Sequence, residues 1–365
     1  MADNKKSNTR NQTNPLFNDR KLKLGTFSTN LAYAGALTTV EGTHEATWPA
    51  VISLAKMADK MEFEAIVPVA RWRGFGGETN AAGPGFETMT FAAGVGAATN
   101  YPCIFATTHV PLVHPITAAK QMTVIDHITG GRSCLNIVTG WNKPEFEMFG
   151  VELIEHDKRY DMAEEWLEIV NRLWNENDEF DHQGEFFEIN KGYLEPKPLQ
   201  TPRPVVMNAG GSDRGRHYAS KFADIAFVAP KSRDFEVLKG MVSSYYDLGR
   251  DEYDNVLQMW TNCYIVQGDT EKEAQEKLKF YIYEKGDWEA GAKLVETMGI
   301  NARTFTEEQM TGMKAHFMAG WGGYPLVGTK EQIVEKMIKL NDCGFNGMLL
   351  TWVKFEEEMQ ARIYM

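Results

Sequence analysis

Two arginines on either side of a tryptophan are the first residues in the sequence that suggest a binding or catalytic site. The segment Arg71-Trp72-Arg73-Gly74-Phe75-Gly76-Gly77 directly follows an apolar, strand-like run. At the carboxyl end of a barrel strand, the planar guanidinium of an arginine can hold an anion or a polarised carbonyl. A merely flexible loop would need the glycines but not the two arginines. We therefore interpret Arg71 as a candidate site residue.

An amide within an apolar strand is the second signal. Asn136 lies in the middle of the run 134–138, and a buried amide without partners costs about 1–3 kcal/mol. One interpretation is a core asparagine with satisfied hydrogen bonds. The other directs its amide at a ligand over the mouth of a barrel. Thr107 ends the preceding apolar run and is a weaker candidate of the same kind.

A glycine-rich turn between a strand and a helix is the third signal. Gly210 and Gly211 allow the backbone to approach a ligand closely, and Ser212 can cap the following helix, whose positive dipole end attracts anions. Many such turns are only turns. Arg159 and Tyr160, at the start of the predicted helix 158–175, could offer a charged donor and a hydroxyl to the same phosphate.

Other catalytic motifs are missing from the sequence. It has no GxGxxG, P-loop or nucleophile elbow, which argues against a Rossmann dehydrogenase, a P-loop NTPase and an α/β-hydrolase. Neither His109 nor His114 has a second histidine at metal-ligand spacing, so we predict no metal site and assign neither to catalysis.

Alternating strands and helices would have to position these residues. Apolar runs without strict alternation suit parallel strands covered on both faces. The stretches 139–157, 176–202 and 284–326 are too long for ordinary loops, so we expect them to build the active site or a lid. A (β/α)8 TIM barrel with long βα insertions is predicted by eight such runs, at 23–27, 64–67, 103–107, 134–138, 204–207, 225–228, 257–266 and 348–351.

Charge and composition limit the partners. The 365 residues carry a formal net charge of −12, which argues against nucleic acid or an anionic membrane as the main partner. No apolar run reaches the length of about 18 residues that a membrane span needs. The four cysteines are widely spaced, as in a reduced, cytoplasmic protein. Residues 1–20 are predicted as a flexible polar leader and 21–365 as a single barrel domain.

In this order, the motifs resemble those of the bacterial luciferase-like flavin-dependent monooxygenases, over roughly residues 22–360. Within that family the chain is most similar to the branch of the pyrimidine and dimethylsulfone monooxygenases. The segments that carry the resemblance are Arg73–Gly77, Ile125–Arg132, Asn136–Glu147, Arg159-Tyr160, Ala209–Asp213 and Val327–Thr329.

The resemblance implies a two-component enzyme that takes reduced FMN from a separate NAD(P)H:flavin reductase. Such an enzyme uses O2, through a flavin-N5-peroxide in the pyrimidine branch, to oxygenate a small organic compound. We expect a heterocyclic, halogenated or organosulfur substrate and a homodimer or homotetramer. Because the pyrimidine enzyme has lysine at the position of Arg71, we expect uracil to be a poor substrate.

The resemblance also implies roles for individual residues. Residues that correspond to the FMN contacts are Ala70, Arg71, Asn136, Glu145, Arg159, Tyr160 and Ser212. The first four would lie along the flavin ring and ribityl chain, and the last three would hold the phosphate. Asn136 and Thr107 would place O2 near the flavin, which makes them, with Arg71, the catalytic candidates.

Three alternatives stay open at this point. A luciferase-like oxidoreductase could use the deazaflavin F420 in place of FMN. A flavin-free barrel lyase or isomerase could use the Gly210–Ser212 turn for a substrate phosphate. A flavin-binding protein without turnover is the third, and the presence of both Asn136 and Thr107 argues against it.

Overall fold

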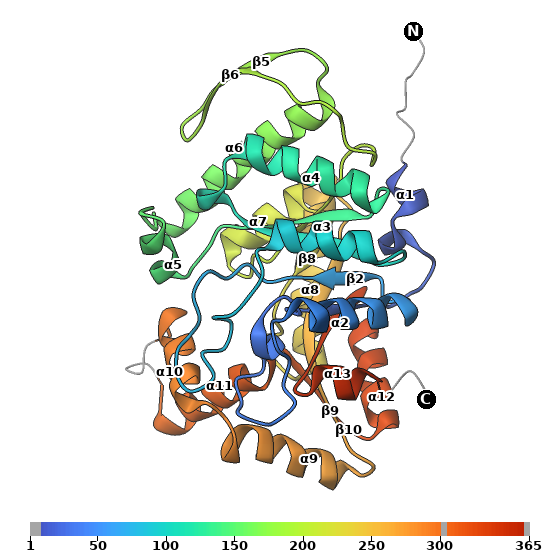
Figure 1. Ribbon diagram of the computed structural model, residues 1–365, viewed down its shortest axis with the longest axis vertical. Coiled ribbons are helices and arrows are strands. Elements are labelled where there is room, and N and C mark those ends of the chain that lie inside the picture. The colour runs from blue at the N-terminus through green and yellow to red at the C-terminus, as the bar shows by residue number, and fades with distance from the viewer. Residues whose placement is uncertain (1–8, 301–304, 361–365) are drawn as a thin grey trace.

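Parallel strands close into a barrel in the computed structural model, which describes residues 9–300 and 305–360 (Figure 1). The ring closes because β8 pairs with β9, and β9 pairs with β11, which in turn pairs with β1. This confirms the predicted (β/α)8 barrel and all eight predicted strands. In ring order the strands are β1 (Lys23–Phe27), β2 (Ala65–Val67), β3 (Cys103–His109), β4 (Ser133–Val138), β7 (Val205–Asn208), β8 (Ile225–Phe227), β9 (Gln258–Gln267) and β11 (Gly347–Trp352).

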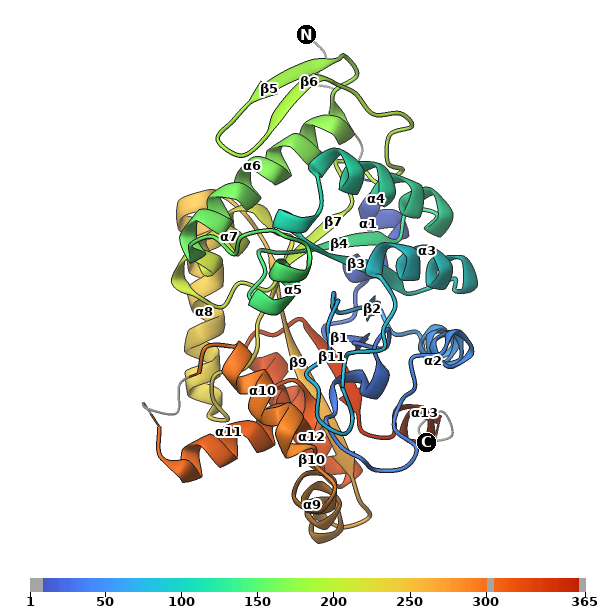
Figure 2. The ribbon, with the colours of Figure 1, turned by 60° about the vertical axis from the view of Figure 1, so that its left-hand side comes forward.

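Helices connect successive strands and cover the outside of the barrel (Figure 2). The amphipathic α6 (His156–Asn175) begins two residues before the prediction, because Glu155 caps it by accepting from the N–H groups of Asp157 and Lys158. The other covering helices are α2 (Trp48–Lys60), α3 (Thr88–Ala98), α4 (Pro115–Thr129), α7 (Asp213–Phe222), α8 (Phe235–Tyr253), α12 (Lys330–Asp342) and α13 (Phe355–Gln360).

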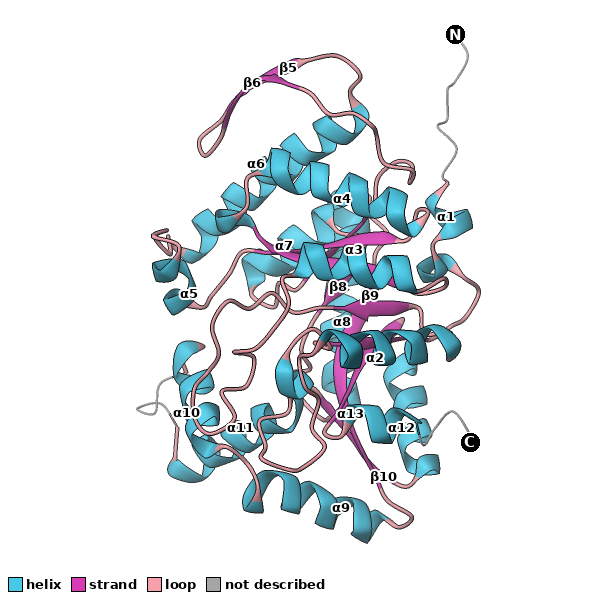
Figure 3. Cartoon of the chain, viewed as in Figure 1, coloured by secondary structure: helices cyan, strands magenta, loops and turns pink. Residues whose placement is uncertain are grey.

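Each of the three long insertions contains structure of its own (Figure 3). The first carries the short helix α5 (Lys143–Met148), and the second forms the antiparallel hairpin β5 (Phe180–Gln183) and β6 (Glu188–Gly192). The third adds a strand outside the ring that pairs with β9, which the sequence analysis did not predict. Elements following β9 are α9 (Glu271–Lys279), η4 (Phe280–Glu284), α10 (Trp288–Thr297), α11 (Glu307–Gly320) and β10 (Tyr324–Gly328).

The polar leader is a packed plug where the structure describes it. Residues 1–8 lie outside the described residues, but α1 (Arg10–Thr13) and η1 (Pro15–Phe17) are folded. Leu16 is fully buried among side chains that alternate along the barrel strands, and its carbonyl accepts from Nε2 of Gln258 at 2.8 Å. The prediction of a flexible leader is therefore wrong for residues 9–20. A single leucine in an otherwise largely polar segment fills this end of the barrel.

Within the described part of the chain, no helix has the length and apolar character needed to cross a bilayer. The remaining short helical turns are η2 (Ala32–Gly35) and η3 (Val110–Leu112).

Candidate active site

A cavity of about 310 Å³ opens at the carboxyl ends of β2, β3, β4 and β7. In (β/α)8 barrels this end holds the active site, and the volume falls in the range of small-molecule sites. Glu145 is the one predicted site residue that does not line it. The cavity brings together the other seven, which are Ala70, Arg71, Thr107, Asn136, Arg159, Tyr160 and Ser212.

One end of the cavity is a backbone cradle after β7. The hydroxyl of Ser212 caps α7 by accepting from the N–H of Gly215 at 3.0 Å. The side chain of Asn208 holds the turn from below, since its Oδ1 accepts from the N–H of Gly210 at 2.9 Å. A Cβ added at Gly211 would meet no atom within 4 Å, so the backbone there is open to a ligand. The cradle thus offers a helix N-terminus to an anion.

Arg159 and Tyr160 face this cradle from the first turn of α6. The guanidinium of Arg159 donates to the carbonyl of Gly140, while its buried Nε has no hydrogen-bond partner among the described residues. Burial lowers the pKa of Arg159 and raises that of Tyr160, and the nearby hydroxyl groups of Thr139 and Ser212 partly offset the second effect. A buried donor without a partner is costly unless a ligand supplies the acceptor.

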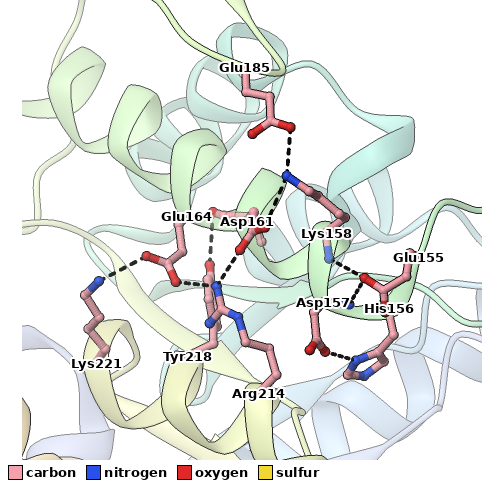
Figure 4. Close-up of polar contacts among 11 residues, drawn as sticks. Glu155, His156, Asp157, Lys158, Asp161, Glu164, Glu185, Arg214, Tyr218 and Lys221 are labelled. Atoms are coloured by element: carbon pink, nitrogen blue, oxygen red, sulfur yellow. Dashed lines mark hydrogen bonds and ion pairs between the residues drawn. The ribbon is translucent and has the colours of Figure 1, made fainter.

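Ion pairs fix the spacing between these two helices (Figure 4). Arg214 on α7 reaches Asp161 at 3.1 Å and Glu164 at 2.6 Å on α6, and Lys221 also contacts Glu164 at 3.0 Å. Surface pairs of this kind contribute little singly, but a network can fix a geometry. This network holds Arg159 and Ser212 on opposite sides of one cradle.

The other end of the cavity holds the Asn136–Thr107 pair. The two residues are register partners on β4 and β3, and Nδ2 of Asn136 donates to the hydroxyl oxygen of Thr107 at 3.1 Å. The hydroxyl of Thr107 donates in turn to the carbonyl of Pro68 at 2.6 Å. Oδ1 of Asn136 is buried and has no partner in the described chain. The interpretation of Asn136 as a core asparagine with satisfied hydrogen bonds therefore does not hold for Oδ1.

Glu145 organises the loop after β2 instead of lining the cavity. Its Oε1 accepts from the backbone N–H of Trp72 at 2.8 Å, and its Oε2 lies 3.4 Å from the guanidinium of Arg71. The guanidinium also stacks 4.6 Å from the ring centroid of Trp141. Burial lowers the pKa of Arg71, and the Glu145 carboxylate partly offsets this effect. Glu145 is thus positioned to act through Arg71.

His109, which was not predicted as a site residue, lines the cavity. β3 runs on to His109, two residues beyond Thr107, so both side chains project to the same face of the strand. Burial, with a further effect of Arg71, lowers the pKa of His109 to about 3, which keeps the imidazole neutral. This spacing of two residues was a signal available in the sequence.

Other residues that line the cavity were not predicted individually as site residues, among them Thr139, Trp141, His156 and Asn208. Among the residues that the structure places, no group of three or more His, Cys, Asp or Glu is arranged to hold a metal ion.

Comparisons with known proteins identify the family of the chain. The family model described as luciferase-like monooxygenase matches residues 25–347. The chain is 30% identical over 321 residues to the FMNH2-dependent dimethylsulfone monooxygenase of Pseudomonas putida, covering 84% of both chains. It is 28% identical over 310 residues to the pyrimidine monooxygenase RutA of Yersinia enterocolitica, covering 83% of both.

A solved structure supports the fold. The long-chain alkane monooxygenase LadA superposes with a TM-score of 0.81 at 21% identity, covering 95% of this chain and 90% of that one.

Proposed function

We propose how the cavity serves the activity of the family to which the chain belongs, the luciferase-like monooxygenases. The chain is a flavin-dependent monooxygenase that uses reduced FMN and O2. The proposal rests on one observation. A single cavity carries hydrogen-bond donors suited to an anion at one end, and the Asn136–Thr107 pair beside Arg71 at the other end. FMN has the matching polarity, with a phosphate at one end and a redox-active ring at the other.

The residues present fit this cofactor. The unpartnered Nε of Arg159, the helix N-terminus at Ser212 and the open backbone at Gly211 would receive the phosphate. Ala70 and Arg71 would lie along the ring. Glu145 would contribute indirectly, by holding Arg71 in place.

Reduced FMN supplies two electrons and two protons, so that one atom of O2 enters the substrate and the other leaves as water. The chain's part is to bind, orient and exclude bulk water. The second N–H of Asn136 Nδ2 would donate to oxygen as negative charge develops on it, and Thr107 would hold that amide in place. The neutral His109 would line the same region without adding a cation.

The remaining parts of the proposal concern partners. Reduced FMN would come from a separate NAD(P)H:flavin reductase in a transient encounter. The substrate would be a small heterocyclic, halogenated or organosulfur compound, with uracil a poor one. Four buried free cysteines suit a reducing compartment such as the cytoplasm. Assembly would be a homodimer or homotetramer, and light scattering giving 41.2 kDa would contradict this.

Oxygen incorporation tests the proposed function. The protein is mixed with FMN, a flavin reductase, NADH and ¹⁸O2, and panels of the three compound classes are screened by mass spectrometry. One ¹⁸O atom in an organic product is the expected result. A protein that binds no flavin would instead support the lyase or isomerase alternative, and activity with reduced F420 alone would support the deazaflavin alternative.

A further inference from the structure

A second cavity, of about 410 Å³, adjoins the first and shares four lining residues with it: Ala70, Arg71, Thr107 and His109. We propose that this second cavity holds the organic substrate and selects uncharged compounds that carry a hydrogen-bond acceptor over anions. The inference rests on the proposed function, because it takes the first cavity as the FMN site.

The charges around the second cavity disfavour an anion. Among the described residues that line it, Arg71 is the one lysine or arginine, and Glu145 already neutralises that guanidinium from behind. Glu87 adds a carboxylate to the wall while capping α3. The formal charges of these three groups sum to one negative charge. An anion that entered would lose its hydration without meeting an uncompensated cation.

The polar lining of the second cavity favours a ligand with a hydrogen-bond acceptor. Nε of Arg71 is buried and has no hydrogen-bond partner among the residues described. The hydroxyl of Thr108, which lines only the second cavity, is in the same state. A carbonyl or similar oxygen would satisfy such a donor without bringing a charge.

The exposed part of the lining favours a ligand with an apolar body. Trp72 and Phe149 are 42% and 41% exposed and pack edge-to-face at the cavity, with ring centroids 5.0 Å apart. Met89, Leu112 and Val113 continue the apolar lining. A compound with an apolar body and one acceptor group would match both the apolar and the polar parts of the lining.

Matched probes test this inference on the FMN-loaded protein. Heptan-4-one is neutral and heptanoate is an anion with the same number of carbons. Anaerobic calorimetry with saturating FMN should give a Kd at least about tenfold lower for the ketone, a difference of about 1.4 kcal/mol. Heptanoate binding as tightly as the ketone, or no binding of the ketone, would overturn the inference.

Two variants locate the binding. Leu112→Trp should fill the second cavity and weaken ketone binding at least about tenfold, with the affinity for FMN unchanged. Ile128→Trp adds the same ring at an exposed position of α4 outside both linings, and should bind like the wild type. Unchanged ketone binding in Leu112→Trp would place the substrate elsewhere and overturn the inference.

Glu145→Gln tests the charge argument. Without its counter-ion, Arg71 should reverse the preference and bind heptanoate more tightly than heptan-4-one. A Glu145→Gln variant that folds, binds FMN and still prefers the ketone would overturn the charge argument. If Glu145→Gln does not fold, Leu112→Trp still tests whether the second cavity holds the substrate. Failure of the wild type to bind FMN would instead contradict the proposed function itself.

Discussion

Asn136 donates a hydrogen bond to Thr107 across two neighbouring strands at 3.1 Å, and its own amide oxygen is left without a partner in the described chain. Because the hydroxyl hydrogen of Thr107 points to the carbonyl of Pro68, Thr107 fixes the orientation of the amide. Asn136 lines the cavity, and Thr107 accepts from one of the two N–H groups on its Nδ2 in the described chain. The second N–H, held in a fixed orientation, can stabilise negative charge that develops on oxygen without reorganising.

Asn136→Ala should bind FMN within a few-fold of the wild type and lose substrate oxygenation by about 10²–10³-fold, as when one oxyanion donor is removed. NADH consumption with the reductase should then yield hydrogen peroxide in place of product. Product and peroxide are measured together, using the substrate found in the oxygen-18 screen. Retained product formation would remove Asn136 from the chemistry.

Arg159→Ala should weaken FMN binding about ten- to a hundredfold, since a hydrogen bond to a charged group contributes about 1.5–3 kcal/mol. Fluorescence titration of FMN gives the affinity. Arg172→Ala is the matched control, because Arg172 lies on the same helix but contacts Glu176 and Phe180 away from the cavity. Equal flavin affinities in the two variants would contradict the phosphate assignment.

The sequence predicted the barrel and several of the residues that line the cavity for the same reason. Each buried strand is a short apolar run, and the polar residues at its end stand out against it, as Asn136 does. The position of Glu145 behind Arg71 could not be predicted, because its contacts with Arg71 and Trp72 join residues more than seventy positions apart. The extra strand β10 was missed for a related reason, since its pairing with β9 depends on tertiary packing.

Leu16→Ala should lower the free energy of unfolding by about 2–5 kcal/mol, the usual cost of truncating a fully buried leucine. Urea denaturation measures the change. Val256→Ala, at a position 94% exposed, should change stability by less than about 0.5 kcal/mol. A loss at Leu16 as small as at Val256 would show that the plug does not contribute to the barrel core.

His109 should make the protein less stable as the pH falls. Its pKa is about 3 in the folded chain and near 6.5 when exposed to solvent. Between these values the unfolded state binds the proton and the native state does not, so the free energy of unfolding decreases from pH 7 to pH 5. His44 and His316, whose pKa values burial also lowers, act in the same direction.

His109→Gln should therefore lose less stability than the wild type between pH 7 and pH 5, because one of these histidines no longer titrates on unfolding. Urea denaturation at both pH values gives the difference for each protein. His127→Gln is the control for the substitution itself, since this exposed side chain on α4 contacts the carbonyl of Lys197 at the surface, and its free energy of unfolding at pH 7 should match the wild type within about 0.5 kcal/mol. If His109→Gln kept the full wild-type decrease, the pKa of His109 would not be lowered in the native protein, and the cavity beside Arg71 would hold a histidine that becomes charged as the pH falls from 7 to 5.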